Sequence, residues 1–182
     1  MHYLLIGALL AVVVIWVISV HRRLAVMDEN INSAMNQIGV QLSSQFDALC
    51  ALLDLTRNYA AHEAQSLLET VHARRRAITA LSTPDDVSEQ EQLISETLGR
   101  VFAVAEQHPE LKSNESYLKC ISAVDGYEKM VRTSRLIYND SVTKRNRELR
   151  LFPASLLAGL FGFRRRAYLE AEEESATLPH MH

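Results

Sequence analysis

The chain has 182 residues, of which 48% are hydrophobic and 23% are charged, and its formal net charge is -3. A small negative charge offers no electrostatic attraction to nucleic acid, so we expect no nucleic-acid partner. Only six glycines and four prolines interrupt the chain, and hairpin patterns are nearly absent. The composition therefore predicts an all-α protein.

An uncharged stretch covers residues 3–20, with the sequence YLLIGALLAVVVIWVISV. As a helix it would be roughly 27 Å long, close to the thickness of a bilayer core of about 30 Å. The alternatives are a cleaved signal peptide, which would carry its basic residues before the apolar run, and a buried core helix, which is usually shorter. We predict a single membrane span, with residues 1–23 as the anchor and its basic flank.

The basic flank predicts the orientation of this span. His21, Arg22 and Arg23 follow the apolar run, and Lys and Arg next to a span are retained preferentially in the cytoplasm. We therefore expect the N-terminus outside and residues 21–182 in the cytoplasm. Cys50 and Cys120 fall inside helical patterns, and we interpret both as small packed thiols without a redox role.

Residues 24–81 contain no proline, and their apolar residues recur at three- and four-residue steps. This spacing predicts one long helix that continues the span. Two rows also follow an eleven-residue spacing: Met27, Ile38, Leu49, Ala60 and Val71, and Ile31, Leu42, Leu53 and Ala64. An eleven-residue repeat indicates a nearly straight helix with a long packing seam. An ordinary amphipathic bundle helix needs no such repeat and is the favoured alternative.

Two further helices are predicted after this one. Thr83 and Pro84, followed by two acids, mark the start of a helix over residues 84–107, and Asn114 caps another over residues 114–150. Together with residues 24–81 they form an antiparallel bundle with coiled-coil-like packing. The link at 108–113 either keeps the chain running back toward the membrane or reverses it. The helix over 24–81 and the next two together are each roughly 90 Å long, so a continuing link would return residue 150 to the membrane surface. We favour the continuing link because of the apolar stretch that starts at Leu151.

The same link contains polar side chains and a proline next to helix ends. Capping explains Pro109 and Asn114, and a docking surface for a partner is the alternative.

Residues 151–169 combine the apolar run LFPASLLAGLFGF with three arginines. This pattern is typical of a segment that lies against acidic lipid headgroups, while packing onto the bundle or an oligomer contact is the favoured alternative. Residues 170–182 are expected to form an acidic, polar tail. The candidate partner or lipid contacts are Leu156, Leu157, Leu160, Phe161, Phe163, Arg164, Arg165 and Arg166.

The motifs that carry chemistry in other proteins are incomplete in this chain. His62 and Glu63 begin a zinc-protease-like motif, but position 66 is serine, and the E-x-x-H over residues 69–72 is single. Basic runs at 74–76 and 144–150 are mixed with acids, which is typical of solvated helix faces. We therefore predict no enzymatic activity, no cofactor and no metal site.

Five ordered motifs resemble those of the LemA family. They are QIGVQL at 37–42, NYAAHE at 58–63, AVAEQHPELKSNE at 103–115, YND at 138–140 and FPASLLAGLFGF at 152–163. The resemblance implies a bacterial inner-membrane protein, anchored by one span and folded as a helical bundle, with no catalytic residues to carry over. It also implies a membrane zinc peptidase as a partner, because some members are linked to such enzymes.

The leading hypothesis is a non-enzymatic membrane-anchored scaffold that self-associates and organises a membrane patch or recruits partners. Its premise is that the apolar rows on the long helix exceed what the other helices can cover. The alternative is an adaptor or regulator of a membrane metallopeptidase in envelope stress. The expected partners are thus membrane lipid, further copies of the chain in a homo-oligomer, and a membrane zinc peptidase.

Overall fold

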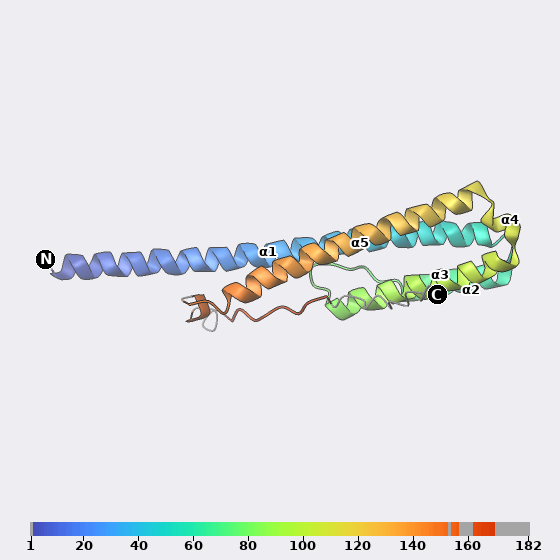
Figure 1. Cartoon of the computed structure of the whole chain (residues 1–182). Helices are drawn as coiled ribbons and strands as arrows, with labels where there is room; N and C mark the ends of the chain where they lie inside the picture. The colour runs from blue at the N-terminus through green and yellow to red at the C-terminus, as the bar shows by residue number, and fades with distance from the viewer. Residues whose placement is uncertain (1, 153, 157–161, 170–182) are drawn as a thin grey trace, which may run out of the picture.

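The computed structural model describes residues 2–152, 154–156 and 162–169. The N-terminal part of α1 projects alone, and the other helices pack along its remaining length (Figure 1). The predicted all-α fold with a long N-terminal helix is confirmed. Within the described residues every regular element is a helix: α1 His2–Thr56, α2 Ala61–Arg74, α3 Pro84–Gln107, α4 Pro109–Lys112 and α5 Glu115–Glu148.

The predicted span continues into the bundle without a break. α1 has 55 residues and contains the apolar segment 3–20 at its start. At 1.5 Å per residue it is about 82 Å long. The expected continuation of the apolar segment into a long helix is confirmed as far as Thr56.

Beyond Thr56, the expected helix over residues 24–81 is wrong. The Thr56 hydroxyl donates to the Leu52 carbonyl (2.8 Å), and the Ala60 N–H donates to the Thr56 carbonyl (3.0 Å), which closes a short turn. α2 then runs back along α1. Apolar spacing could not reveal this reversal, because two helices joined by a short turn keep the same period. The apolar side chains that α2 buries are Ala64, Leu67, Leu68 and Val71.

Residues 75–81 are also not helical, contrary to expectation. The backbone becomes extended at Arg75, and the segment crosses α1 at Gly39. A Cβ atom at residue 39 would collide with the Ile78 carbonyl oxygen, so glycine is what lets the two backbones approach. The Arg75 guanidinium fixes the crossing segment by pairing with the Asp47 carboxylate on α1 (2.8 Å).

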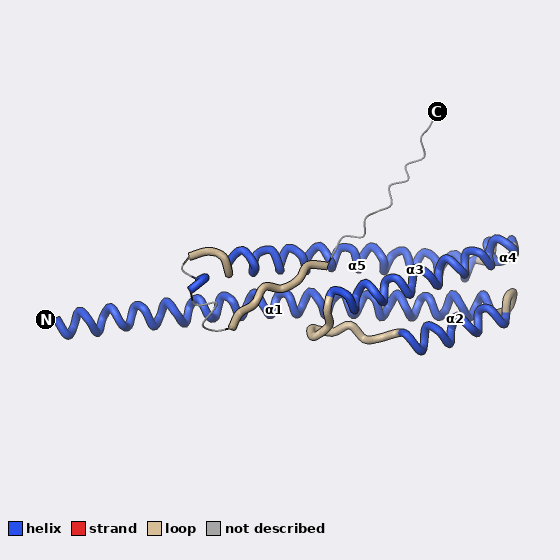
Figure 2. The backbone as a smooth tube through the Cα atoms, turned by 90° about the horizontal axis from the view of Figure 1, so that it is seen from below, coloured by secondary structure: helices blue, strands red, loops and turns tan. Residues whose placement is uncertain are grey.

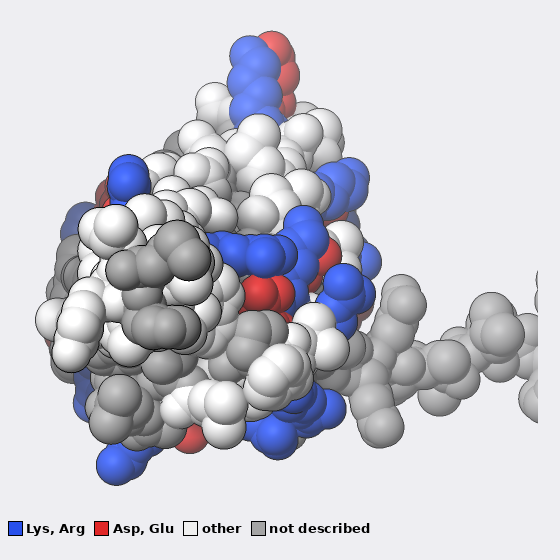
Figure 3. Space-filling view, turned by 90° about the vertical axis from the view of Figure 1, so that its left-hand side faces the viewer, with Lys and Arg blue, Asp and Glu red and all other residues white. Residues whose placement is uncertain are grey.

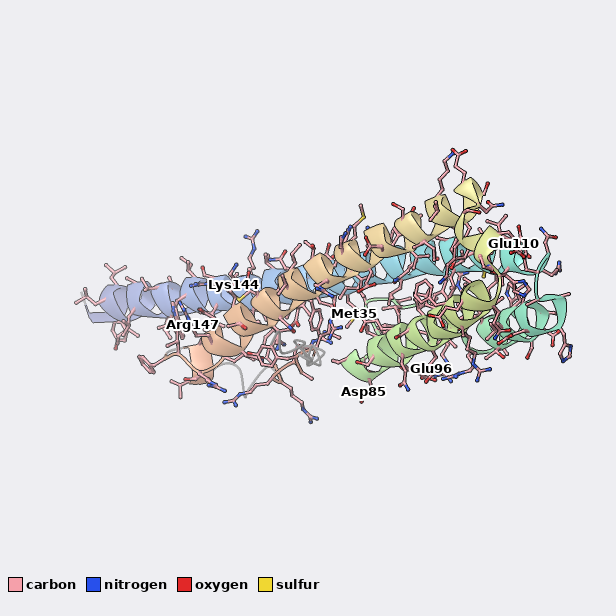
Figure 4. All side chains as sticks on the ribbon, turned by 45° about the vertical axis from the view of Figure 1, so that its right-hand side comes forward. Met35, Asp85, Glu96, Glu110, Lys144 and Arg147 are labelled. Carbon is pink, nitrogen blue, oxygen red and sulfur yellow. The ribbon has the colours of Figure 1, made fainter. Side chains whose placement is uncertain are left out.

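α3 spans the residues predicted for it. Asp86 accepts a hydrogen bond from the Thr83 N–H (2.7 Å) and donates its own N–H to the Thr83 hydroxyl (3.2 Å), which forms a capping box. The helix rises from Asp85 toward Glu110 at the far end of the bundle (Figure 4).

The link after α3 reverses the chain, so the favoured continuing link is wrong. α5 then returns antiparallel to α1, as the tube in Figure 2 shows. Residue 150 still comes back near the end of the predicted span, because the unpredicted turn after Thr56 adds one more reversal. Asn114 caps α5 by accepting from the N–H groups of Ser116 (2.9 Å) and Tyr117 (3.2 Å).

The side chains that α1 and α5 bury follow a seven-residue spacing, which is typical of helices packed at a shallow angle. The predicted eleven-residue rows include some of the same buried residues, such as Ile31 and Leu42. The seven-residue rows also contain polar residues, so a search for apolar residues alone did not show the shorter repeat. The α1 rows are Leu24, Ile31, Ile38, Gln45 and Leu52, and the half-buried Asp28 with Met35, Leu42, Leu49 and Thr56; the α5 row is Tyr117, Val124, Val131, Tyr138 and Arg145.

Candidate functional site at the base of the bundle

The base of the bundle, where α5 and the chain after it meet α1, holds the residues predicted to contact lipid or a partner. The Arg23 guanidinium pairs with the Glu148 carboxylate (3.2 Å). Leu24 and Leu149 form a small apolar cluster separate from the main core, with Val20 and Phe163 packed against it. The end of α5 therefore lies at the level where the apolar segment of α1 ends.

A buried ion pair lies one helical turn further into the bundle. The Arg145 Nε lies 2.8 Å from one Asp28 carboxylate oxygen, and its Nη2 donates to the other (3.0 Å). The Arg145 side chain is only 4% exposed. It also donates to the Arg164 carbonyl and lies over the Phe163 ring, 6.0 Å from the centroid. Arg145 thus joins α1, α5 and the chain after α5 at one point.

Residues 163–169, which we call the strap, run extended along α5 and are held by two asparagines. The Asn146 amide donates to the Arg166 carbonyl (2.9 Å) and accepts from the Arg166 N–H (3.1 Å). Asn139 makes the same pair of bonds with the backbone of Leu169 (2.8 and 2.9 Å).

The spacing of the two asparagines matches the strap. Seven residues of helix advance about 10.5 Å, and three extended residues advance about 10 Å. Asn139 and Asn146 therefore meet the strap at residues 169 and 166 in register. The Tyr138 hydroxyl adds a bond to the Ala167 carbonyl (3.1 Å), and burial raises the pKa of this phenol against a smaller opposing effect of Arg166, which keeps it a donor.

The predicted contact residues separate into groups. Leu156 is 68% exposed, and Arg164 and Arg165 are exposed. Phe163 instead packs inward, with its ring 5.7 Å from that of His21, and Arg166 turns toward Asp28 (3.5 Å). Leu157, Leu160 and Phe161 lie outside the described residues.

Two exposed apolar side chains at the base were not among the predicted contacts. Phe152 is 80% exposed, and Leu151 is also exposed. Both belong to the apolar run that the sequence marks, so the signal was present. Figure 3 views this end of the molecule, where lysine and arginine lie at several places around the rim and, beside acidic side chains, near the centre of the view. The exposed arginines here include Arg22, Arg150 and Arg165.

Sequence reasoning missed the residues that position this surface: Asp28, Asn139, Arg145 and Asn146. The run at 144–150 was interpreted as a solvated face, but Arg145 and Asn146 within it are buried. Asn139 lies in the YND motif, which was the available signal.

Other reactive groups do not gather in one place. Among the described residues, no three His, Cys, Asp or Glu side chains lie together as metal ligands would. Cys50 and Cys120 are both thiols packed against the main core. Burial raises the pKa of the Cys50 thiol, with a smaller opposing effect of Arg75, so it stays protonated at neutral pH.

Most of the chain matches a known protein family. Residues 34–182 match the family described as the LemA family. Two curated relatives are the magnetosome proteins MamQ 1 and MamQ 2 of Paramagnetospirillum magneticum. Each is 23% identical to this chain over an alignment 203 residues long, gaps included. The alignment covers 97% of this chain and 75% of the relative.

Proposed function

Since the chain belongs to the LemA family, we propose that it is a membrane-anchored, non-enzymatic scaffold that self-associates and organises a membrane patch or recruits partners. The observation that carries this proposal is α1. Its most apolar 18-residue window has a mean hydropathy of 2.8, and none of that window is buried against the rest of the chain. A helix of this length and composition, with no cover in the protein, is the kind that a bilayer covers.

A second exposed apolar surface, at the base, supports the same function. Leu151, Phe152 and Leu156 expose apolar surface at the level where the apolar segment ends, next to Arg150 and Arg165. Apolar side chains with arginines around them suit the headgroup region of an acidic bilayer. The bundle would then stand on the membrane at two points, the span and the base.

We propose the orientation expected from the basic flank, with the N-terminus outside the bacterial inner membrane and the bundle in the cytoplasm. Arg22 and Arg23 directly after the span support it.

The original reason for expecting self-association needs correction. The apolar rows on α1, including Ile31, Ile38 and Leu49, are buried within a single chain. Self-association therefore needs a different surface, one that the chain's own helices leave uncovered.

Extraction of the full chain in mild detergent, followed by measurement of the particle mass, tests the scaffold. We expect a defined oligomer, and a monomer at every concentration would overturn the proposal. Crosslinking in cells with mass spectrometry adds a second readout. Links between copies support the scaffold, whereas consistent links to a membrane zinc peptidase, with none between copies, would replace it with the adaptor.

A further inference from the structure

An open groove lies between α1 and α5, on the side of the helix pair away from the strap. Its volume is about 630 Å³. The strap bonds to Asn139 and Asn146, and neither residue lines the groove. The lining residues are Met27, Asn30, Ser33, Ala34, Gln37 and Gln41 on α1, and Met130, Thr133, Ser134, Ile137, Ser141 and Lys144 on α5.

Three hydroxyl side chains of α5 line the groove: Thr133, Ser134 and Ser141. The hydroxyls of Thr133 and Ser141 each donate to the carbonyl four residues earlier on α5 (2.9 and 2.8 Å). Each hydroxyl oxygen can also accept a hydrogen bond from a polar group that docks in the groove.

The charge of the groove indicates what kind of surface could dock there. Of its twelve lining residues only Lys144 is charged, and its ammonium group already pairs with the Asp140 carboxylate (2.6 Å). When two copies of one surface face each other, both carry the same charge. Two charged copies therefore repel each other, and two neutral copies do not. Amides such as Gln37 carry both a donor and an acceptor, so each can bond to its own copy.

The position of the groove on α1 favours a neighbour in the same membrane. It begins at Met27, a short distance after the apolar segment, so an identical chain with the same orientation presents its groove at the same height. Steps of about 3.6 residues back along the helix place Arg23, Ser19, Trp16 and Val12 on the same face. The one charged residue of this stretch, Arg23, already pairs with the Glu148 carboxylate (3.2 Å). The groove face thus continues into the apolar segment.

We propose that this groove is where a second copy of the chain docks, with the two α1 helices side by side. The inference rests on the proposed membrane-anchored scaffold and names its self-association surface. On α1 the groove spans residues 27–41, or about 21 Å of helix. Stable dimers bury roughly 800 Å² per partner, which is more than so short a stretch of two helices is expected to offer. The span must therefore contribute, and replacing residues 3–20 with a soluble leader is expected to cost assembly.

Cysteine crosslinking of the full chain in membrane vesicles tests the surface, in a background with Cys50→Ser and Cys120→Ser. Gln37→Cys lies in the groove, and the neighbouring Asn36→Cys is the matched control, because one step along a helix turns the side chain by about 100°. Ile137→Cys and Leu136→Cys form the same kind of pair on α5. We expect a short bis-maleimide to link copies through the groove positions several-fold faster than through the controls.

The possible outcomes separate this inference from the scaffold itself. If the chain is an oligomer but the control positions link as fast as the groove positions, the groove is wrong and the scaffold stands. If all four variants stay monomeric and so does the parent, both fail. As a second measurement, Gln37→Glu is expected to shift the detergent-extracted particle toward monomer, whereas Asn36→Asp is not. An unchanged oligomer with Gln37→Glu would count against the groove.

Discussion

At the scale of single residues, a side-chain amide offers the same donor and acceptor as a peptide group. The side chains of Asn139 and Asn146 each donate to and accept from the backbone of one strap residue, as a neighbouring β-strand would. Two asparagines on a helix therefore hold an extended segment that has no strand beside it, and each asparagine fixes one residue of the strap.

The first prediction concerns Asn146. Asn146→Asp keeps the acceptor for the Arg166 N–H but replaces the donor to the Arg166 carbonyl with an oxygen. Loss of this buried bond is expected to cost about 1–3 kcal/mol locally. The strap carries three arginines, so trypsin cleavage within it should become faster. The control is Asn36→Asp, because the native Asn36 side chain makes no hydrogen bond within the described residues. It should leave the cleavage rate unchanged.

A second prediction concerns Gly39. Alanine normally stabilises a helix relative to glycine, but here the added Cβ would meet the Ile78 carbonyl. Gly39→Ala is therefore expected to lower the free energy of unfolding by about 1–3 kcal/mol. Gly99→Ala is the control, because nothing lies near that position, and it should raise the same quantity by about 0.5–1 kcal/mol. Urea unfolding measures both, and equal signs would refute the close approach.

A third prediction concerns pH. Hydrogen bonds from the Thr83 N–H and hydroxyl lower the pKa of the Asp86 carboxyl. A carboxyl with a lowered folded-state pKa contributes stability above its unfolded pKa of about 3.9 and loses it as the pH falls through the folded value. Stability should thus decline below about pH 4. Asp86→Asn should flatten this decline in melting temperature, and Asp85→Asn should preserve it.

At the scale of elements, α1 and α5 carry one ion pair within otherwise apolar seven-residue rows. Asp28 and Arg145 occupy facing positions on these rows, 117 residues apart in the sequence. Because the pair forms only when these two turns of helix face each other, it selects one register of α5 against α1.

This pairing leads to a fourth prediction. Asp28→Ala leaves the Arg145 charge buried without its partner, which is expected to cost about 3–5 kcal/mol. The double variant Asp28→Leu with Arg145→Leu should recover most of that loss, because no buried charge remains. Thermal unfolding in detergent measures both. A single variant as stable as the parent would mean that the pair contributes nothing.

Elements marked by local signals were predictable from the sequence, and those decided by distant contacts were not. The start of α3 is marked by Thr83, Pro84 and Asp86, and that of α5 by Asn114. Both could be predicted because a helix cap depends only on residues within about four positions of one another. The reversal after Thr56 and the crossing at Gly39 depend on packing against residues far along the chain, which periodicity does not report.

The same division applies to the candidate site. The apolar and basic pattern of residues 151–166 was visible as a run, so the base surface was partly predicted. Arg145 and Asn146 looked like solvated residues of a basic helix, because a single polar side chain carries no sign of a partner elsewhere. Their partners are Asp28, on another helix, and the Arg166 backbone, 20 residues on.

At the scale of the whole molecule, the bundle reaches far from the proposed membrane. Residues 21–56 of α1 span about 54 Å, with α4 and the turn after α1 at the far end. A scaffold of this shape would hold its tip well clear of the lipid and press its base against it.

A fifth prediction follows for the base. In a Trp16→Phe background, Phe152→Trp is expected to show blue-shifted fluorescence in anionic vesicles and strong quenching by lipids labelled near the headgroup. Phe102→Trp, on an exposed position of α3 away from the base, is the control and should be quenched little. Equal, weak quenching at both positions would exclude lipid contact at residue 152.

Because α1 is one unbroken helix from the apolar segment to Thr56, the rotation of the apolar segment about the helix axis fixes the rotation of the bundle. One residue inserted near residue 21 would leave the helix intact but turn everything beyond it by about 100° and lift it about 1.5 Å. Seven inserted residues would nearly restore the angle while adding about 10 Å of height. Rotation and height are therefore separable quantities in this protein, and the rotation of the apolar segment sets the angle at which the bundle faces its surroundings.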